Sequence, residues 1–162
     1  MILLKFLWHI NAFIKIIFYK MIFGKKIKWG KHVTFRENFS LVVDGGKVVI
    51  GNNVFFNNNC SIVSHKSIII GENCIFGEGV KIYDHNHKFA KYNVEKKYQG
   101  FSSSEIKIGK NCWLANNVII LKGAEIGDNS VIGAGCVIKN KIPANVIVSL
   151  SGDYNIQKIR YR

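Results

Sequence analysis

The chain has 162 residues, of which 48% are apolar, and its 23 lysines and arginines against 10 acidic residues give a net charge of +13. This length suits one domain, and no low-complexity linker or recognisable secretory cleavage site divides or precedes it. The charge favours an anionic partner, such as the phosphates of a small ligand, an acidic polysaccharide or an anionic membrane surface. No recognition helix or basic-aromatic RNA motif occurs, which argues against nucleic acid.

Residues 1–24 are predicted to form an amphipathic helix, within an N-terminal segment that spans 1–28. Lysines interrupt the apolar run, which argues against a transmembrane span. We expect the helix to cap the open end of the following structure or to pack between protomers; a peripheral membrane contact through 1–24 is the alternative. Its apolar positions recur at helical spacing: Leu3, Phe6, Leu7, Ile10, Phe13, Ile14, Ile17 and Met21.

A strict period of six residues begins after the helix and is clearest between Ile108 and Pro143. Such a period fits a chain that turns a corner every six residues, so that three short strands form one triangular coil and successive coils stack. The small residue in the second place is expected to tighten the corner, as glycine does where φ is unusual. The first place of each six is aliphatic and is predicted to fill the interior: Ile108, Leu114, Ile120, Ile126, Ile132 and Ile138.

Earlier coils follow the same rhythm less regularly. The steps from Leu41 to Ile50 and from Ile62 to Ile70 exceed six, and we expect the surplus residues at corners, where a solenoid tolerates insertions. Four cysteines occupy fifth places and are predicted to be buried, reduced thiols. The inward residues of these coils are Trp29, Phe35, Leu41, Ile50, Phe56, Ile62, Ile70, Phe76 and Ile82, and the cysteines are Cys60, Cys74, Cys112 and Cys136.

One large interruption separates Ile82 from Ile108. The excess forms a lysine- and tyrosine-rich loop over 88–104, and long loops on a rigid scaffold commonly carry binding function. The coiled domain is therefore expected to span 29–152. The basic tail 153–162 is predicted to cover the edge of the last coil, which otherwise exposes unpaired strand hydrogen bonds.

The sixes, with the phrases IGDNSVIGAGCVI and KIPAN, resemble the hexapeptide-repeat acyltransferases, and in particular their galactoside, maltose and polysaccharide O-acetyltransferase branch. The resemblance implies an all-β, left-handed parallel β-helix of about five to six triangular coils. It also implies acetyl transfer from acetyl-CoA to a sugar hydroxyl of an envelope or capsular glycan or its precursor. Members of this class are homotrimers with active sites between protomers.

The sequence IYDHNHKF precedes the long loop and carries the candidate base. By the resemblance, His87 falls on the histidine that deprotonates the acceptor hydroxyl, while His85 contacts sugar or orients His87. The backbone N–H of Asn116 matches the donor to the oxyanion. Histidine titrates near neutral pH, which suits general base catalysis. Two histidines on one strand could also bind zinc, but a third ligand at the expected spacing is missing, so no metal is expected.

The resemblance also assigns a cofactor groove. Backbone groups of Ala115, Asn116 and Ala134 are expected to line the pantetheine, with Lys139 and Asn140 near the nucleotide phosphates. Trp113 occupies a customary aromatic position, although packing at a protomer interface explains it equally well. The chain departs from the family after Val148, where a usual proline and lysine are missing.

For the acceptor, Asn57 matches an asparagine that binds substrate in sugar acetyltransferases, although asparagine also suits a corner. His65 stands where galactoside and maltose enzymes keep an aspartate, which puts those particular sugars in doubt. Asp84 is a further candidate contact, and either Asp84 or Glu105 could instead fix the histidine tautomer.

Other functions remain open at this stage. They are a serine O-acetyltransferase, an acyltransferase acting on an amino sugar or antibiotic, and a non-catalytic β-helix that only binds, since fold alone does not fix function. The chain is expected in the cytoplasm, either free or at the inner face of the membrane.

Overall fold

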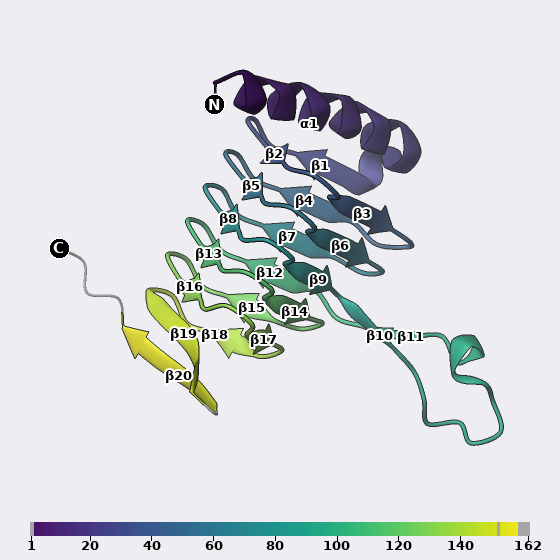
Figure 1. Cartoon of the computed structure of the whole chain (residues 1–162). Coiled ribbons are helices and arrows are strands. Elements are labelled where there is room, and N and C mark those ends of the chain that lie inside the picture. Colours follow the sequence, from purple (N-terminus) through teal and green to yellow (C-terminus); the bar gives the residue numbers. More distant parts are fainter. Residues whose placement is uncertain (1, 152, 159–162) are drawn as a thin grey trace.

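The computed structural model describes residues 2–151 and 153–158. A helix, α1 (Ile2–Phe23), and a short 3-10 turn, η1 (Gly24–Lys26), lead into a three-sided prism of parallel strands (Figure 1). Each side of the prism is one sheet, and consecutive strands of the chain pass from side to side. This arrangement confirms the predicted left-handed parallel β-helix.

The three sides are named here face 1, face 2 and face 3 in the order in which the chain meets them. Face 1 contains β1 (Ile27–Trp29), β4 (Val48–Ile50), β7 (Ile68–Ile70), β12 (Ile106–Ile108), β15 (Glu125–Ile126) and β18 (Lys141–Ile142). Face 2 contains β2 (Thr34–Phe35), β5 (Phe55–Phe56), β8 (Ile75–Phe76), β13 (Trp113–Leu114), β16 (Val131–Ile132), β19 (Val146–Ser151) and β20 (Asp153–Lys158). Face 3 contains β3 (Ser40–Val43), β6 (Ser61–Ser64), β9 (Lys81–Tyr83), β14 (Ile119–Leu121) and β17 (Val137–Ile138).

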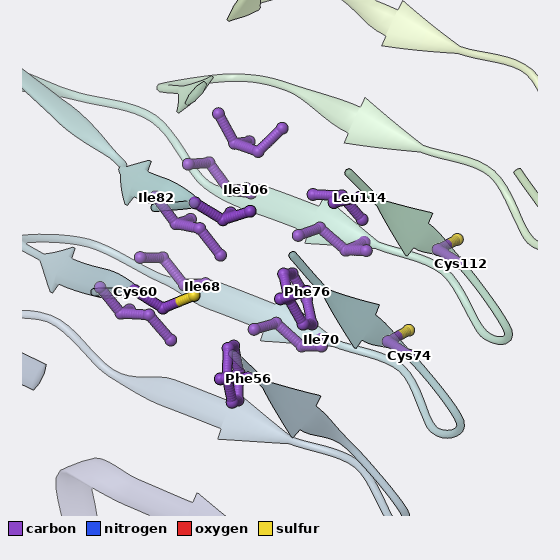
Figure 2. Packing of buried hydrophobic residues seen from close by; sticks show 14 of the residues in the cluster. Phe56, Cys60, Ile68, Ile70, Cys74, Phe76, Ile82, Ile106, Cys112 and Leu114 are labelled. Carbon is purple, nitrogen blue, oxygen red and sulfur yellow. The ribbon is translucent and has the colours of Figure 1, made fainter. Parts of the chain in front are cut away.

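The interior is a continuous column of the side chains predicted from the period. In register along face 1, Ile50 pairs with Ile70 and Ile70 with Ile108. All six first-place aliphatics from Ile108 to Ile138 are buried, and so are all four cysteines. Figure 2 shows part of this packing, with Cys60, Cys74, Cys112 and Leu114 labelled. The core is therefore built by stacking, because each coil contributes only three short strands and covers the coil beside it.

The first coils are filled by aromatic rings. Phe35 stacks on Phe39 at 4.4 Å between ring centroids, Phe39 packs on Phe56 at 5.0 Å, and Phe56 stacks on Phe76 at 4.5 Å. Trp29 is only partly buried and lies between this column and Tyr19 of α1. The column connects the helix to the interior of the third coil.

The reason predicted for the second-place glycines at the corners, an unusual φ, is wrong. The glycines in the second place do not have a positive φ; a Cβ at Gly71, for example, would lie 2.5 Å from the carbonyl oxygen of Gly109 in the next coil. These positions need glycine because backbones approach closely. The left-handed φ falls instead in the fourth place, where Asn73, Asn111 and Asn129 sit, and asparagine tolerates that conformation well.

All departures from the six-residue period lie at one corner, between face 3 and face 1 (corner 3–1). The surplus residues of the steps after Leu41 and after Ile62 lie there, and so does the long interruption. The interruption begins as a hairpin of β10 (His85–His87) and β11 (Phe101–Ser103), with a 3-10 turn, η2 (Lys96–Tyr98), near its tip. Figure 1 shows this hairpin and its loop projecting away from the prism as an arm.

Each end of the prism carries an additional element. The tail strand β20 pairs antiparallel with β19 along its length, so the tail covers the edge of face 2 as predicted, whereas β17 and β18 are the last strands of faces 3 and 1. At the other end α1 lies across the first coil (Figure 1). The side chains that face the coil are Ala12, Ile16, Tyr19 and Phe23. From Leu7 onward, the apolar stripe identified from the sequence points outward and is exposed, as at Ile14 and Ile17.

Candidate active site

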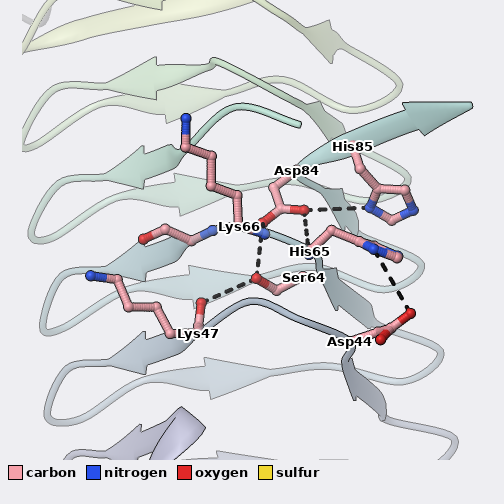
Figure 3. A network of polar contacts seen from close by, with 8 residues as sticks. Asp44, Lys47, Ser64, His65, Lys66, Asp84 and His85 are labelled. Carbon is pink, nitrogen blue, oxygen red and sulfur yellow. Dashed lines mark hydrogen bonds and ion pairs between the residues drawn. The ribbon is translucent and has the colours of Figure 1, made fainter. Parts of the chain in front are cut away.

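Asp84 organises corner 3–1. Its side chain is fully buried and accepts hydrogen bonds from the backbone N–H groups of His65, Lys66 and Ser67 at 2.7–2.8 Å, and from the Ser64 hydroxyl at 2.8 Å (Figure 3). The two surplus residues of the second coil lie here. The carboxylate therefore satisfies backbone donors at a bend that interrupts the regular strand pairing.

These hydrogen bonds keep Asp84 ionised. Burial by itself raises the pKa of the carboxyl group, but the three backbone donors and Ser64 outweigh it and lower the pKa below its ordinary value. Because Asp84 is buried and its oxygens are engaged, its position argues against the predicted direct contact with an acceptor. The position of Asp84 instead fits the role of fixing the histidine tautomer, since His85 Nδ1 lies 3.4 Å from Asp84 Oδ1. Glu105, the other candidate for that role, pairs with Lys107 at 3.0 Å.

His85 is held among other rings at the base of the arm. Its ring centroid lies 4.0 Å from that of His65 and 5.2 Å from that of Phe101, and its side chain is 15% exposed. Burial, and then the neighbouring His65, lower the pKa of His85 despite the carboxylate of Asp84. His85 is therefore a neutral imidazole at physiological pH, fixed in place by its surroundings.

His87 lies two residues further along β10 and is exposed. Its ring packs at 4.5 Å on Phe101, which comes from the opposite strand of the hairpin. His87 and His85 both line an open groove of about 430 Å³ with Val63 and Tyr83 from the outer side of face 3. The groove thus offers an accessible imidazole beside a fixed one.

Phe101 is a residue that sequence reasoning missed. It contacts His65, His85 and His87, at centroid distances of 4.3, 5.2 and 4.5 Å. The sequence offered no signal that distinguished Phe101 from the other aromatic residues of the loop, Phe89, Tyr92 and Tyr98. The register of β10 with β11 places Phe101 opposite His87.

Most predicted cofactor residues lie at a different corner, between face 2 and face 3 (corner 2–3). Asn116 and Ala134 occupy this corner in adjacent coils, where the Asn116 carbonyl accepts a hydrogen bond from Gly135 N–H at 2.9 Å. Ala115 precedes Asn116, and Trp113 projects outward from β13 with half its surface exposed. Asn57 also lies here, where its Oδ1 accepts a hydrogen bond from Arg36 at 3.1 Å.

Lys139 and Asn140 are placed apart from that group. They follow β17 and so lie at corner 3–1 of the last coil, both exposed, beside a small pocket that Ile156 of β20 also lines. They share their corner with the histidines but not their coil. The predicted cofactor residues are therefore divided between two edges of the prism.

The two corners are far apart in one chain. They flank face 3, and in the third coil they are separated by β9 (Lys81–Tyr83) and the bend at Asp84. The five residues from Val80 to Asp84, at about 3.3 Å each, span roughly 15 Å. The histidines and Asn116 of one chain therefore lie at opposite edges of face 3.

The cysteines do not contribute a nucleophile to either corner. Burial raises the pKa of the Cys60 thiol to about 11, so that it stays protonated at neutral pH. Within 2–151 and 153–158, no group of three or more His, Cys, Asp or Glu side chains could hold a metal ion. Over the same residues, no helix combines the length and apolar character needed to cross a bilayer.

Comparison with known families agrees with this architecture. The family described as bacterial transferase hexapeptide (six repeats) matches residues 105–140, and the hexapeptide repeat of succinyl-transferase matches 47–83. The crystal structure of a maltose O-acetyltransferase from Clostridium difficile 630 is similar, with 30% identity and a TM-score of 0.69 over 88% of this chain and 75% of that one. The chain belongs to the hexapeptide-repeat acetyltransferase family.

Particular relatives share shorter stretches. The galactoside O-acetyltransferase of Escherichia coli K12 is 49% identical over 47 residues, which is 29% of this chain and 23% of that protein. The E. coli K12 protein WbbJ, provisionally named a lipopolysaccharide biosynthesis O-acetyl transferase, is 35% identical over 43% of this chain and 39% of its own. The matches thus span well under half of these relatives. A galactoside acetyltransferase structure in complex with coenzyme A has 29% identity and a TM-score of 0.67 over 80% of this chain and 66% of that one.

Proposed function

We propose that this protein is an acetyl-CoA-dependent O-acetyltransferase that acts on a sugar hydroxyl of an envelope or capsular glycan or its precursor. The observation that carries the proposal is an exposed imidazole, His87, in an open groove beside His85, which Asp84 and its neighbours hold in place. Relatives named for galactoside, maltose and lipopolysaccharide acetylation support the acceptor class.

The proposed reaction is direct transfer. A nitrogen of His87 removes the proton of the sugar hydroxyl as its oxygen attacks the thioester carbonyl carbon, which gives a tetrahedral oxyanion. A backbone N–H such as that of Asn116 donates a hydrogen bond to this oxygen. Collapse breaks the carbon–sulfur bond, and the imidazolium returns the proton to the departing CoA thiolate. No covalent enzyme intermediate is required, which agrees with the burial of all four thiols.

We propose that the working unit is a homotrimer, because the site is incomplete in one chain. Histidines at corner 3–1 of one copy would meet Asn116 and Ala134 at corner 2–3 of the next. Acetyl-CoA would lie between the copies, with Trp113 beside it and Lys139 or Asn140 near its phosphates. A measured mass of about three times the 18.4 kDa chain is expected in solution.

The outer surfaces of the prism support this packing. Face 2 carries a straight apolar row, since Phe55 pairs with Ile75, Ile75 with Trp113, and Trp113 with Val131. Face 3 adds outward apolar side chains such as Val42, whereas face 1 is mostly charged, with ion pairs such as Lys141 to Glu125 at 3.1 Å. Contact between copies along these two faces removes apolar surface from water and leaves face 1 in solvent.

The arm extends the proposed acceptor surface. Lys122 donates a hydrogen bond to Ser102 at 2.6 Å, which fixes one end of the loop to the prism. Hydrogen bonds between Gln99 and the backbone of Lys91 close the loop on itself. Its exposed aromatic and basic side chains suit an anionic sugar chain. They are Phe89, Tyr92, Tyr98, Lys88, Lys91, Lys96 and Lys97.

The test measures CoA release with acetyl-CoA and a panel of glycans for the wild type and for His87→Ala, His85→Ala and His32→Asn. We expect His87→Ala to lower kcat by about 10²–10⁴-fold with unchanged thermal stability. His32→Asn removes a surface histidine at another corner, where asparagine suits its φ of 57°, and should keep full activity. Loss in His85→Ala alone would transfer the base to His85; full activity in both would reject histidine catalysis.

A further inference from the structure

The outward face of α1 is the largest apolar feature that neither the fold nor the proposed site uses. Ile10, Ile14, Ile17 and Met21 recur at helical spacing along it, with Met21 79% exposed. Eight large apolar side chains of this one helix are at least 41% exposed: Leu7, Ile10, Phe13, Ile14, Ile17, Phe18, Met21 and Ile22. Monomeric surfaces rarely expose contiguous apolar patches of this kind without a partner.

The position of this face excludes the trimer as its partner. α1 lies across the end of the prism, and its opposite side packs on the first coil through Ala12, Ile16 and Tyr19. The outward stripe therefore points along the prism axis (Figure 1). Contacts between faces 2 and 3 of neighbouring copies lie along the sides and leave this stripe uncovered.

The charge around the stripe indicates what covers it. Residues 1–36 contain seven lysines and one arginine and no aspartate or glutamate. Lys20 and the cluster Lys25, Lys26, Lys28 and Lys31 are exposed, and no ion pair of the described residues involves them. An apolar stripe bordered by unpaired lysines complements a surface that is apolar inside and anionic outside.

We propose that α1 docks the protein on an anionic phospholipid bilayer, lying parallel to the surface with Ile10, Ile14, Ile17 and Met21 among the acyl chains. The lysines contact lipid phosphates, and long lysine stems let their ammonium groups stay at headgroup depth. In the proposed trimer the three helices lie at the same end of the assembly, so they engage one membrane together and strengthen binding.

The orientation of the protein on the membrane also indicates which class of acceptor it uses, an inference that rests on the proposed function. His87 leaves the prism at the third coil, two coils from the one that α1 covers. At about 4.8 Å per coil, the groove lies about 10 Å further from the membrane than the first coil. A glycan anchored in the same membrane by a lipid reaches this height with its first sugars, so a lipid-linked saccharide is the acceptor class that the geometry favours.

The experiment is co-sedimentation of the full-length protein with vesicles of equimolar phosphatidylglycerol and phosphatidylcholine, or of phosphatidylcholine alone. We expect the wild type to pellet with the anionic vesicles and to be released by high salt. The double variant Ile14→Glu/Ile17→Glu should bind at least tenfold more weakly. Tyr92→Glu, which adds a charge at a fully exposed aromatic position on the arm, should bind as the wild type does.

A second pair of double variants tests whether the lysines near α1 contribute to vesicle binding separately from the apolar stripe. Lys25→Glu/Lys26→Glu should weaken vesicle binding at least tenfold, whereas Lys88→Glu/Lys91→Glu, with the same change of charge on the arm, should not. Wild-type protein that stays in the supernatant, or Ile14→Glu/Ile17→Glu that pellets normally, overturns the proposal. A wild-type mass of twice the trimer that falls to the trimer in Ile14→Glu/Ile17→Glu also overturns it, since a second copy then covers the stripe.

Failure of this proposal is distinguishable from failure of the proposed function. CoA release with a soluble glycan acceptor is measured on the same samples, and Ile14→Glu/Ile17→Glu should retain it because neither residue approaches the groove. Circular dichroism and the mass of the variant confirm that it is folded and assembled.

Discussion

Two corners of the same prism use the same repeat in opposite ways. At the corner between faces 1 and 2 (corner 1–2), asparagines in the fourth place bond to one another up the stack, as in Asn111 to Asn129 at 2.9 Å and Asn129 to Asn145 at 3.3 Å. At corner 3–1 the period is broken four times, by surplus residues after Leu41, Ile62 and Ile82 and by a step of only four residues from Ile138 to Ile142. A buried carboxylate, Asp84, replaces the repeated ladder there.

The difference shows where a solenoid can acquire a site. Corner 1–2 keeps its six residues and is occupied by contacts between neighbouring coils, so its asparagine side chains are structural. Surplus residues at corner 3–1 leave backbone N–H groups without a partner in the next coil, and Asp84 satisfies them. The same carboxylate lies beside His85, so the residue that stabilises the irregular bend also positions the ring next to the candidate base.

The sharpest test of this comparison is Asp84→Asn. The amide has nearly the same shape but cannot accept three backbone hydrogen bonds as a charge, so we expect a loss of about 2–4 kcal/mol in the free energy of unfolding at pH 7. Urea unfolding at a fixed protomer concentration measures it, because a trimer's stability depends on concentration.

The pH dependence of the same variant identifies the cause. The folded pKa of Asp84 lies below its unfolded value, so its stabilisation is fully present above the unfolded pKa, about 3.9, and is lost as pH falls through the folded pKa. The difference in the free energy of unfolding between wild type and Asp84→Asn should therefore become smaller below about pH 4. A difference that stays constant down to pH 2 would show that packing, not charge, accounts for the loss.

A smaller loss of stability is expected at the regular corner 1–2, where the backbones of neighbouring coils approach each other closely. A Cβ at Gly71 would lie 2.5–2.7 Å from backbone atoms of Gly109 and Lys110, so Gly71→Ala should cost about 1–3 kcal/mol. Gly100→Ala is the matched control, because Gly100 has a φ of 76° and no atom within 4 Å of the added Cβ. It should cost about 1 kcal/mol from backbone strain alone. Equal losses in the two variants would contradict the role assigned to close approach.

The smallest effect concerns the asparagine ladder. Asn111 has a φ of 53° and an exposed side-chain hydrogen bond, so Asn111→Gly keeps the conformation and should change stability by less than about 0.5 kcal/mol. Asn111→Ala should cost about 1–2 kcal/mol, because alanine disfavours the left-handed region. Thermal unfolding of both variants distinguishes the two contributions; a larger loss for glycine would mean that the ladder, rather than φ, dominates.

Much of the fold was predictable because the period is local. Spacing alone identified the inward residues from Ile50 to Ile138, the buried cysteines, the helix and the excursion before Ile108. The purpose of the second-place glycines was predicted wrongly, since close approach between coils involves residues about twenty or more apart in the chain. The side of α1 that packs was also not evident, because apolar residues occur on both sides of that helix.

The sequence by itself determined the three-sided stack, since a six-residue rhythm of aliphatic side chains can be buried only by coils that repeat. The same rhythm places each insertion after the third inward residue of a coil. Only the tertiary structure decided that Asp84 is buried at corner 3–1 and that Phe101 packs on His87. The physical reason is that these contacts join residues distant in the chain, and the local pattern contains no information about which backbone donors an insertion leaves to be satisfied.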